Sequence, residues 1–239
     1  LLSNTHPQPP PSLAPEWSQI FQAHQQQQPN DLDTILNENF QENLAIGPPI
    51  DEQKPDTTTR VYFVNPNGFA LLDQGGDFDE WCLEMKRLQS DVICAAEPNI
   101  DSTSSRACRI CHETSRRHFR SYKLELASSA IPSNSTYKPG GTMLLSQGKI
   151  TGRIISSGTD PMGRWAFTRY DGSRGKIITI VVAYQVVSKK VTDNRTKRSS
   201  TVSAQQASMQ RTSAGSYIHP RKLFRTDLLA FLSTCQEAH

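Results

Sequence analysis

The pattern of apolar and polar residues divides the chain near residue 60. Residues 1–59 show neither a helical nor a strand period, and they carry nine of the 15 prolines and a run of glutamines at 25–28. A segment of this composition buries too little apolar surface to offset the entropy that folding removes. We therefore predict a disordered Gln/Pro-rich arm over residues 1–59 and a folded domain over residues 60–239.

The first part of the domain has the pattern strand, helix, strand. Residues 61–64 are a strand-favouring run, and residues 91–96 predict a short buried strand that ends at Glu97. Between them, Asp77 and Glu80 have the spacing of a helix capping pair. The apolar face of the predicted helix comprises Phe78, Trp81, Cys82, Met85 and Leu88.

In the rest of the domain, the sequence pattern predicts one more helix, a series of strands and a closing helix. Helical spacing covers about residues 104–119. Alternation then predicts strands at 122–126, 142–146, 150–157, 164–170 and 176–184. The Asp171-Gly172 turn indicates antiparallel pairing of the later strands, and the aperiodic residues 185–216 predict a long mobile loop. A final helix begins at Pro220, with Phe224, Leu228, Phe231 and Cys235 on one face. The predicted fold class is mixed α/β (α+β).

Charge is distributed unevenly along the chain, although its formal net value is only +3. Residues 1–59 contain one basic residue, Lys54, and eight acidic residues, so the remaining residues carry the whole positive excess. A basic domain of this kind favours an anionic partner such as nucleic acid, and a merely solvated basic surface is the alternative.

Cysteine usage and hydropathy indicate where the protein is found. Five cysteines are an odd number, and most lie within apolar patterns, as in proteins of a reducing compartment. We therefore expect an intracellular protein, nuclear or cytoplasmic. No run approaches the roughly 20 apolar residues of a membrane helix, so we expect no membrane partner. The chain begins at Leu1 rather than Met, which suggests a piece of a longer polypeptide.

Polar side chains follow two predicted strands at the points where the strands end. The first strand runs into Asn65-Pro66-Asn67-Gly68, and the second runs into Glu97. If the two strands pair across the intervening helix, these side chains converge at one rim, and such an oxygen-rich corner suits a hard cation such as Mg²⁺. The alternative is an ordinary turn beside a solvent-exposed glutamate.

Four short motifs follow one another along the domain. They are Asn65-Pro66-Asn67-Gly68-Phe69, Asp91-Val92-Ile93-Cys94-Ala95-Ala96-Glu97, Pro139-Gly140-Gly141-Thr142 and Ala183-Tyr184. In this order they resemble the endonuclease/exonuclease/phosphatase superfamily, and more narrowly the endonuclease domains encoded by retrotransposons. The resemblance implies a two-sheet α/β sandwich with helices outside. It also implies Mg²⁺-dependent (or Mn²⁺-dependent) nicking of DNA during retroelement integration.

The resemblance assigns roles to individual residues. Glu97 matches the glutamate that holds the metal, Asn65 matches an asparagine that helps to build the phosphate site, and Asn67 takes the neighbouring polar position. Tyr184 matches a tyrosine that positions the scissile phosphate. Basic residues of the predicted loop are expected to bind the nucleic-acid backbone: Lys189, Lys190, Arg195, Lys197 and Arg198.

Members of the family carry two later motifs: an Asp-x-Asn that orients the attacking water, and an Asp-His pair that completes the phosphate site. Both motifs are missing from this sequence. It contains no Asp-x-Asn, and no Asp is followed by His. The resemblance covers residues 60–239, which therefore correspond to a partial endonuclease/exonuclease/phosphatase domain, about the first half of the family's domain, truncated at its C-terminus. The implied partners are DNA, and a reverse transcriptase domain or the missing second half. We expect weak or no catalysis by this chain alone, together with an exposed inner apolar sheet face. The alternatives are a non-catalytic nucleic-acid-binding fragment and a phosphoesterase acting on small molecules or lipid headgroups.

A second constellation, Cys108-Arg109-Ile110-Cys111-His112, has the spacing of a haem attachment motif and, with His118, imitates a zinc site. The two cysteines lie one helical turn apart on the apolar face of the predicted helix. Buried thiols are therefore the favoured interpretation.

Overall fold

The structure is a computed structural model that describes residues 53–72, 75–129, 138–186 and 220–237. Residues 1–52 of the predicted arm and residues 187–216 of the predicted loop lie outside this range. By its contacts the chain divides into two units. Of the described residues, those within 45–224 belong to one unit and residues 225–237 to the other. All described strands belong to residues 45–224.

The first sheet has four strands in the order β1-β2-β4-β3. They are β1 (Val61–Val64), β2 (Val92–Ala96), β4 (Thr142–Gln147) and β3 (Tyr122–Ala127). β1 runs parallel to β2, with Val64 opposite Ala95, while β4 is antiparallel to both β2 and β3. The predicted pairing of the first two strands across the helix between them is therefore confirmed.

The second sheet is antiparallel, with the order β5-β6-β7. Its strands are β5 (Ile154–Thr159), β6 (Trp165–Asp171) and β7 (Ile177–Ala183), and the short 3₁₀ turn η3 (Ser173–Gly175) joins the last two. The antiparallel pairing across Asp171-Gly172 agrees with the prediction. The predicted strand at 150–157 is wrong over its first residues, because η2 (Gly148–Arg153) is a 3₁₀ helix. Gly148 there has a φ of +71°, which ends the preceding strand.

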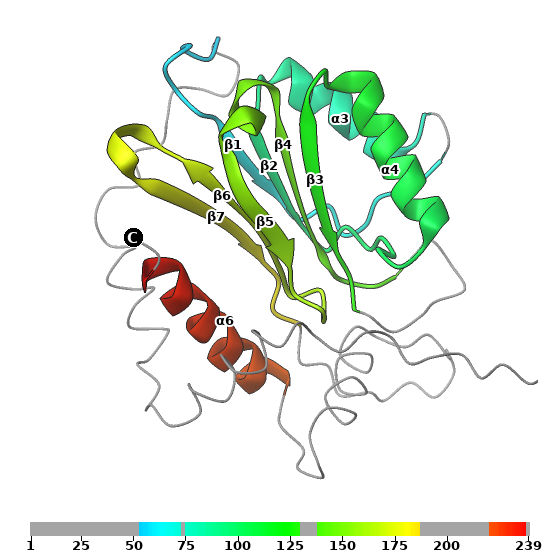
Figure 1. The fold of residues 1–239 in the computed structure, drawn as a ribbon. Coiled ribbons are helices and arrows are strands. Elements are labelled where there is room, and N and C mark those ends of the chain that lie inside the picture. The colour runs from blue at the N-terminus through cyan, green and yellow to red at the C-terminus, as the bar shows by residue number, and fades with distance from the viewer. Residues whose placement is uncertain (1–52, 73–74, 130–137, 187–219, 238–239) are drawn as a thin grey trace, which may run out of the picture. The chain divides into compact units, whose positions relative to one another are not determined.

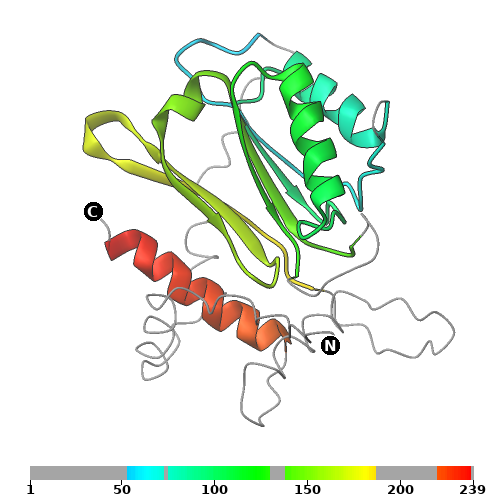
Figure 2. The ribbon, with the colours of Figure 1, turned by 45° about the vertical axis from the view of Figure 1, so that its right-hand side comes forward.

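Two helices and the second sheet cover opposite faces of the first sheet (Figures 1 and 2). Ile93 and Ala95 of β2 face the helices α3 (Asp77–Arg87) and α4 (Ser105–His118), in a core that also contains Met85. The alternate residues Val92 and Cys94 belong to a second core with residues of β6 and β7. All five residues of β2 are buried, as expected of a strand covered on both faces. The mixed α/β class with two sheets and helices is therefore confirmed.

The two helices begin differently. The Ser104 side chain caps α4 by accepting a hydrogen bond from the Ala107 N–H. The capping pair predicted for α3 is wrong, because Gly76 is the N-cap and provides no side-chain hydrogen bond. Asp77 is instead the first helical residue, and its carboxylate accepts the Ala70 N–H at 3.2 Å. Gly76 is required at the cap because an added Cβ would lie 2.6 Å from the Ala70 carbonyl oxygen.

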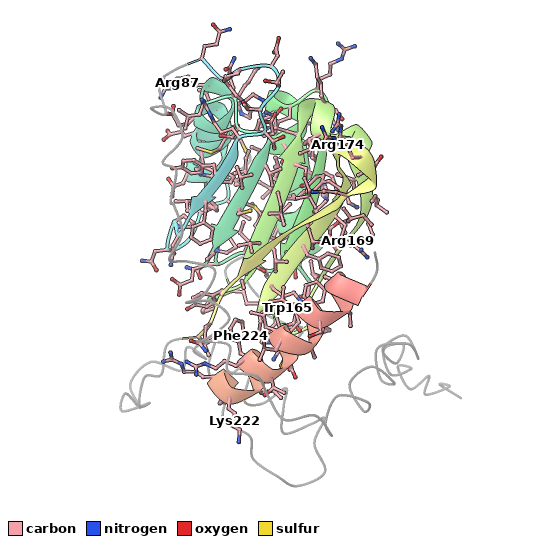
Figure 3. The ribbon with its side chains drawn as sticks, turned by 90° about the vertical axis from the view of Figure 1, so that its left-hand side faces the viewer. Arg87, Trp165, Arg169, Arg174, Lys222 and Phe224 are labelled. Atoms are coloured by element: carbon pink, nitrogen blue, oxygen red, sulfur yellow. The ribbon has the colours of Figure 1, made fainter. Side chains whose placement is uncertain are left out.

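The predicted closing helix is present as α6 (Pro220–Glu237), in which Phe224, Leu228 and Phe231 are buried. The Phe224 ring lies edge-on to Trp165 of β6, with ring centroids 6.3 Å apart (Figure 3). Among the helices of the described residues, none combines the length and the hydropathy that a membrane span requires.

The start of the first sheet is held by a partly buried acidic group, the carboxylate of Asp91. Asp91 accepts two hydrogen bonds from the Lys54 ammonium, at 2.7 and 2.6 Å, and one from the Arg60 N–H at 2.7 Å. Lys54 lies within the predicted arm, whose residues 53–59 are the only ones that the structure describes. For residues 1–52, disorder stays a prediction.

β1 lies at the end of the first sheet among the described strands and carries no charged residue. Tyr62 and Val64 pack against the helix-side core, but Val61 and Phe63 on the opposite face are 50% and 61% exposed. Edge strands without charged residues, prolines or bulges pair readily with other chains. This strand therefore gives the molecule an exposed apolar edge.

We predict that Phe63→Lys reduces self-association, because a charge on an edge strand opposes strand addition. Light scattering coupled to size-exclusion chromatography over a concentration series measures the effect. Leu83→Lys is the control, since Leu83 is 58% exposed but lies on α3 and not on a sheet edge. Equal behaviour of the two variants and the unsubstituted protein would show that the β1 edge does not drive association.

Candidate functional site

Three polar side chains from separate strands meet at one rim of the sandwich. Asn65 follows β1, Glu97 follows β2 and Tyr184 follows β7. The Asn65 Nδ2 donates to Glu97 Oε2 at 2.8 Å, and the Tyr184 hydroxyl donates to Glu97 Oε1. The carboxylate of Glu97 is therefore the centre of the cluster, with one neutral donor on each oxygen.

The strand pairing explains why Asn65 and Glu97 meet. The last paired residues of the parallel strands are Val64 and Ala95, so Asn65 lies one residue beyond the pair and Glu97 two residues beyond it. Parallel strands present their carboxyl ends at the same edge of a sheet, which is where ligands bind in α/β proteins. Two residues 32 positions apart in sequence are thereby brought within hydrogen-bond distance.

The loops at this rim hold several non-glycine residues in the left-handed region of backbone conformation. Asn67 has a φ of 53°, and Glu97 and Asn99 each have a φ of 55°. Asparagine tolerates this conformation, but for a glutamate it costs about 1 kcal/mol or more. Strained non-glycine backbone of this kind is concentrated at functional sites.

Backbone hydrogen bonds hold the strained segment that follows β2. The Glu97 N–H donates to the Gly141 carbonyl at 3.0 Å, and the Asn99 N–H donates to the Gly140 carbonyl at 3.1 Å. On the other side, the Phe69 N–H donates to the Pro98 carbonyl at 3.0 Å. Residues 97–99 are thus tied both to the Pro139-Gly140-Gly141-Thr142 motif and to the loop that carries Asn65.

Tyr184 is positioned by a buried ion pair. Its N–H donates to the Arg164 carbonyl at 2.7 Å. The Arg164 guanidinium makes two hydrogen bonds to the Asp160 carboxylate, from Nε at 2.8 Å and from Nη2 at 2.9 Å, and each side chain of the pair is 2% exposed. Removing one partner of such a pair leaves an uncompensated buried charge, which costs about 3–5 kcal/mol. The pair therefore fixes the backbone opposite the end of β7.

The environment of Tyr184 keeps its phenol protonated. Burial raises the pKa of the phenol above its ordinary value of 10, and the hydrogen bond to Glu97 and the negative charge of that residue raise it further. Tyr184 is therefore a hydrogen-bond donor at neutral pH and not a base.

The rim offers a cation one protein carboxylate, that of Glu97. A carboxylate offers about four acceptor positions, and the side chains of Asn65 and Tyr184 occupy one on each oxygen of Glu97. Mg²⁺ is commonly held by one or two carboxylates, substrate phosphates and several waters. The Asn65 Oδ1 is engaged with the Asn67 N–H at 3.0 Å. In the part of the chain that the structure describes, no group of three or more His, Cys, Asp or Glu side chains could hold a metal.

The structure brings together three of the residues named from the sequence: Asn65, Glu97 and Tyr184. Asn67 joins them through its backbone, and its side chain is exposed. The predicted nucleic-acid-binding residues Lys189, Lys190, Arg195, Lys197 and Arg198 lie outside the described residues. The roles of all these residues stay predictions.

Two contributions to the rim were not predicted from the sequence. Asn99 is 7% exposed and lies beneath the Asn65 loop, and Asp160 with Arg164 supports Tyr184. An asparagine two residues after Glu97 was a weak signal for a left-handed turn, but nothing in the sequence indicated its partner.

The two cysteines of α4, Cys108 and Cys111, are not part of the cluster around Glu97. Cys111 is fully buried, and burial raises the pKa of its thiol to about 12. The Cys108 thiol donates to the Ser102 carbonyl at 3.3 Å. Both cysteines are free thiols in the structure.

Comparisons with known proteins found structural neighbours alone. No family model matches the chain, and no curated protein matches it. One similar solved structure is an endonuclease/exonuclease/phosphatase family protein from Leptotrichia buccalis C-1013-b, with a TM-score of 0.39, 14% identity and coverage of 66% of this chain and 64% of that chain. Another is endonuclease/exonuclease/phosphatase from Beutenbergia cavernae DSM 12333, with a TM-score of 0.34, 10% identity and coverage of 63% and 42%. The chain thus spans less than two thirds of either neighbour.

We predict that Gly68→Ala destabilises the rim, because Gly68 has a φ of +110° and an added Cβ would lie 2.8 Å from Asn99 Nδ2. The matched control is Gly148→Ala, where φ is +71° and nothing lies within 4 Å. Gly148→Ala should lower the free energy of unfolding by about 1 kcal/mol, because of the backbone conformation alone. Gly68→Ala should cost about 1–3 kcal/mol more in the free energy of unfolding, measured by urea denaturation. Equal losses would contradict the close packing of Gly68 on Asn99.

A second prediction concerns the phenol of Tyr184. Glu97→Gln removes the negative charge beside it, so its pKa should fall while burial keeps it above 10. Tyrosine ring-carbon NMR measures the titration, and Tyr184→Phe assigns the signal. Tyr170 is the internal control, because burial is the main cause of its raised pKa and Glu97 makes no contribution to it. An unchanged Tyr184 pKa in Glu97→Gln would show that the two side chains do not interact.

Proposed function

We propose that this chain carries the metal- and phosphate-binding corner of a phosphodiester hydrolase of the endonuclease/exonuclease/phosphatase superfamily, and that its substrate is DNA. One observation carries the proposal, namely that Glu97, Asn65 and Tyr184 converge from three strands on one rim. These are the residues to which the family resemblance assigns the metal and the phosphate.

Each side chain has a role that follows from its contacts. Glu97 would hold Mg²⁺ or Mn²⁺ through the acceptor positions left open on its two oxygens. A metal bound there supplies charge stabilisation for the phosphate and the leaving oxygen. Asn65 uses one of its two amide N–H groups on Glu97, so the other is available to a phosphate oxygen. Tyr184 donates its single proton to Glu97 and so orients the carboxylate.

The proposed reaction needs a group that orients the attacking water. Among the described residues Glu97 is the one carboxylate in this cluster, and the sequence contains no Asp-x-Asn. We therefore expect slow hydrolysis by this chain and assign the water-orienting group to a further polypeptide segment. A retroelement protein with a reverse transcriptase domain is the proposed setting.

A second candidate is a non-catalytic nucleic-acid-binding protein. The observation that favours it is the charge distribution, because the basic excess of the chain lies entirely in residues 60–239. In that case binding would depend on salt, and Glu97 would be dispensable.

Plasmid nicking separates the two candidates. With Mg²⁺ or Mn²⁺ at high protein concentration, we expect slow conversion of supercoiled to open-circular plasmid. Glu97→Gln should lower the rate about 100-fold or more, because it removes the charge that would hold the metal. The matched control is Glu113→Gln, since Glu113 is a half-exposed carboxylate on α4 paired with Arg109.

Two results would contradict the proposed hydrolase. Nicking that survives Glu97→Gln would exclude a mechanism with the metal on Glu97. DNA binding without nicking would favour the non-catalytic candidate if its affinity is equal in the unsubstituted protein and in Glu97→Gln and does not depend on the metal.

A further inference from the structure

Asn99, two residues after Glu97, is a buried polar residue that is hydrogen-bonded to residues 138–140. Its side chain accepts the Gly140 N–H on Oδ1 at 2.6 Å, and this hydrogen bond is buried. Its backbone N–H donates to the Gly140 carbonyl at 3.1 Å, and its carbonyl accepts the Lys138 N–H at 2.9 Å. Three hydrogen bonds therefore fasten this one residue to residues 138–140.

The opposite side of Asn99 packs against the loop that carries Asn65. The position of a Cβ on Gly68 would be 2.8 Å from Asn99 Nδ2 and 3.4 Å from Asn99 Cβ. Only a glycine allows the backbone of that loop to approach so closely. The Asn99 side chain thus lies between the Gly68 backbone and the Gly140 backbone.

The segment that includes Glu97 also depends on this position. Glu97 and Asn99 both have a φ of 55°, so residues 97–99 form a turn whose conformation costs free energy for the glutamate. Such a conformation persists only where the surrounding contacts enforce it. The hydrogen bonds of Asn99 are among the contacts that do so.

We propose that Asn99 is a positioning residue that sets the Glu97 carboxylate against the Asn65 amide. Asn99 holds the turn after β2 at a fixed distance from the loop after β1, and it does so from below the site, with 7% of its surface exposed. The catalytic meaning of this role rests on the function proposed above, but the structural claim does not.

The experiment compares Asn99→Gly with Asn99→Asp. Glycine adopts the same backbone conformation without strain, so Asn99→Gly removes only the side chain. Aspartate keeps an acceptor for the Gly140 N–H and tolerates the left-handed conformation. Ser104→Ala is the stability control, because it removes the cap of α4, in which the Ser104 hydroxyl oxygen accepts a hydrogen bond from the Ala107 N–H.

The first readout is the side-chain amide signal of Asn65 in ¹H–¹⁵N NMR, which does not require activity. Asn99→Gly should move this signal toward its position in Glu97→Gln, while Asn99→Asp and Ser104→Ala leave it near the position in the unsubstituted protein. The second readout is plasmid nicking. Asn99→Gly should lower kcat about tenfold or more with little change in KM, because small displacements of a positioned group cost large factors in rate.

An unmoved Asn65 signal in a folded Asn99→Gly protein would overturn the proposal. If Asn99→Gly does not fold, Asn99→Ser, whose shorter side chain cannot reach Gly140, is judged by the same two outcomes. Nicking that is unchanged in Glu97→Gln, in a protein in which Asn99→Gly still moves the Asn65 signal, would refute the hydrolase and support the positioning role. Nicking that depends on Glu97 and is unchanged in Asn99→Gly, together with an unmoved Asn65 signal, would support the hydrolase and refute the positioning role.

Discussion

The parallel pairing of β1 with β2 is the constraint on which the rest of the site depends. It places the residues that follow the two strands at one edge of the sheet, and there Asn65 donates to Glu97 at 2.8 Å. The pairing is maintained from both faces, because β2 is buried between the helix-side core and the core shared with the second sheet. Asp91 ties the beginning of β2 to Lys54 and to the backbone of Arg60. The geometry of the rim is therefore a consequence of the packing of the whole sandwich.

A second feature of the rim is that its loops are held by one another. The turn after β2 contacts Gly140 and Gly141 on one side and Gly68 and Phe69 on the other. Glycines occur where these backbones approach most closely, and a side chain at Gly141 would lie 2.4 Å from the Ala127 carbonyl oxygen. Fixed loops of this kind preorganise a carboxylate without relying on its own flexible side chain. Tyr184, arriving from the second sheet, adds a neutral donor that remains protonated because it is buried.

Much of the fold could be predicted from local patterns. The strand-helix-strand start, the buried β2 and the turn between β6 and β7 all followed from periodicity and turn residues, and they are confirmed. The pattern of apolar and polar residues was misleading at two positions where a glycine determines the local structure. Gly76 took the cap expected of Asp77, and Gly148 led into a 3₁₀ helix where a strand had been predicted. Side-chain alternation reports neither the positive φ of Gly148 nor the close approach of the Ala70 carbonyl oxygen that excludes a side chain at Gly76.

The candidate site was predictable only in part. The meeting of Asn65 with Glu97 followed from two strand ends in one sheet, which is a local argument combined with one pairing. Tyr184 is 87 residues from Glu97 and entered only through the resemblance of its motif. The contact of Asn99 with Gly140 joins loops 41 residues apart, and no local pattern encodes which loops meet. Such contacts arise from tertiary packing and require the structure.

The most direct measurement of the central claim is a double-mutant cycle between Asn65→Ala and Glu97→Ala, scored by the free energy of unfolding. If the two side chains meet at the rim as described, the summed losses of the two single variants should exceed the loss of the double variant. The difference, which is the coupling energy, should be about 1 kcal/mol, as expected of a hydrogen bond to a charged group. Additive losses, within about 0.3 kcal/mol, would show that Asn65 and Glu97 do not interact and would contradict the account.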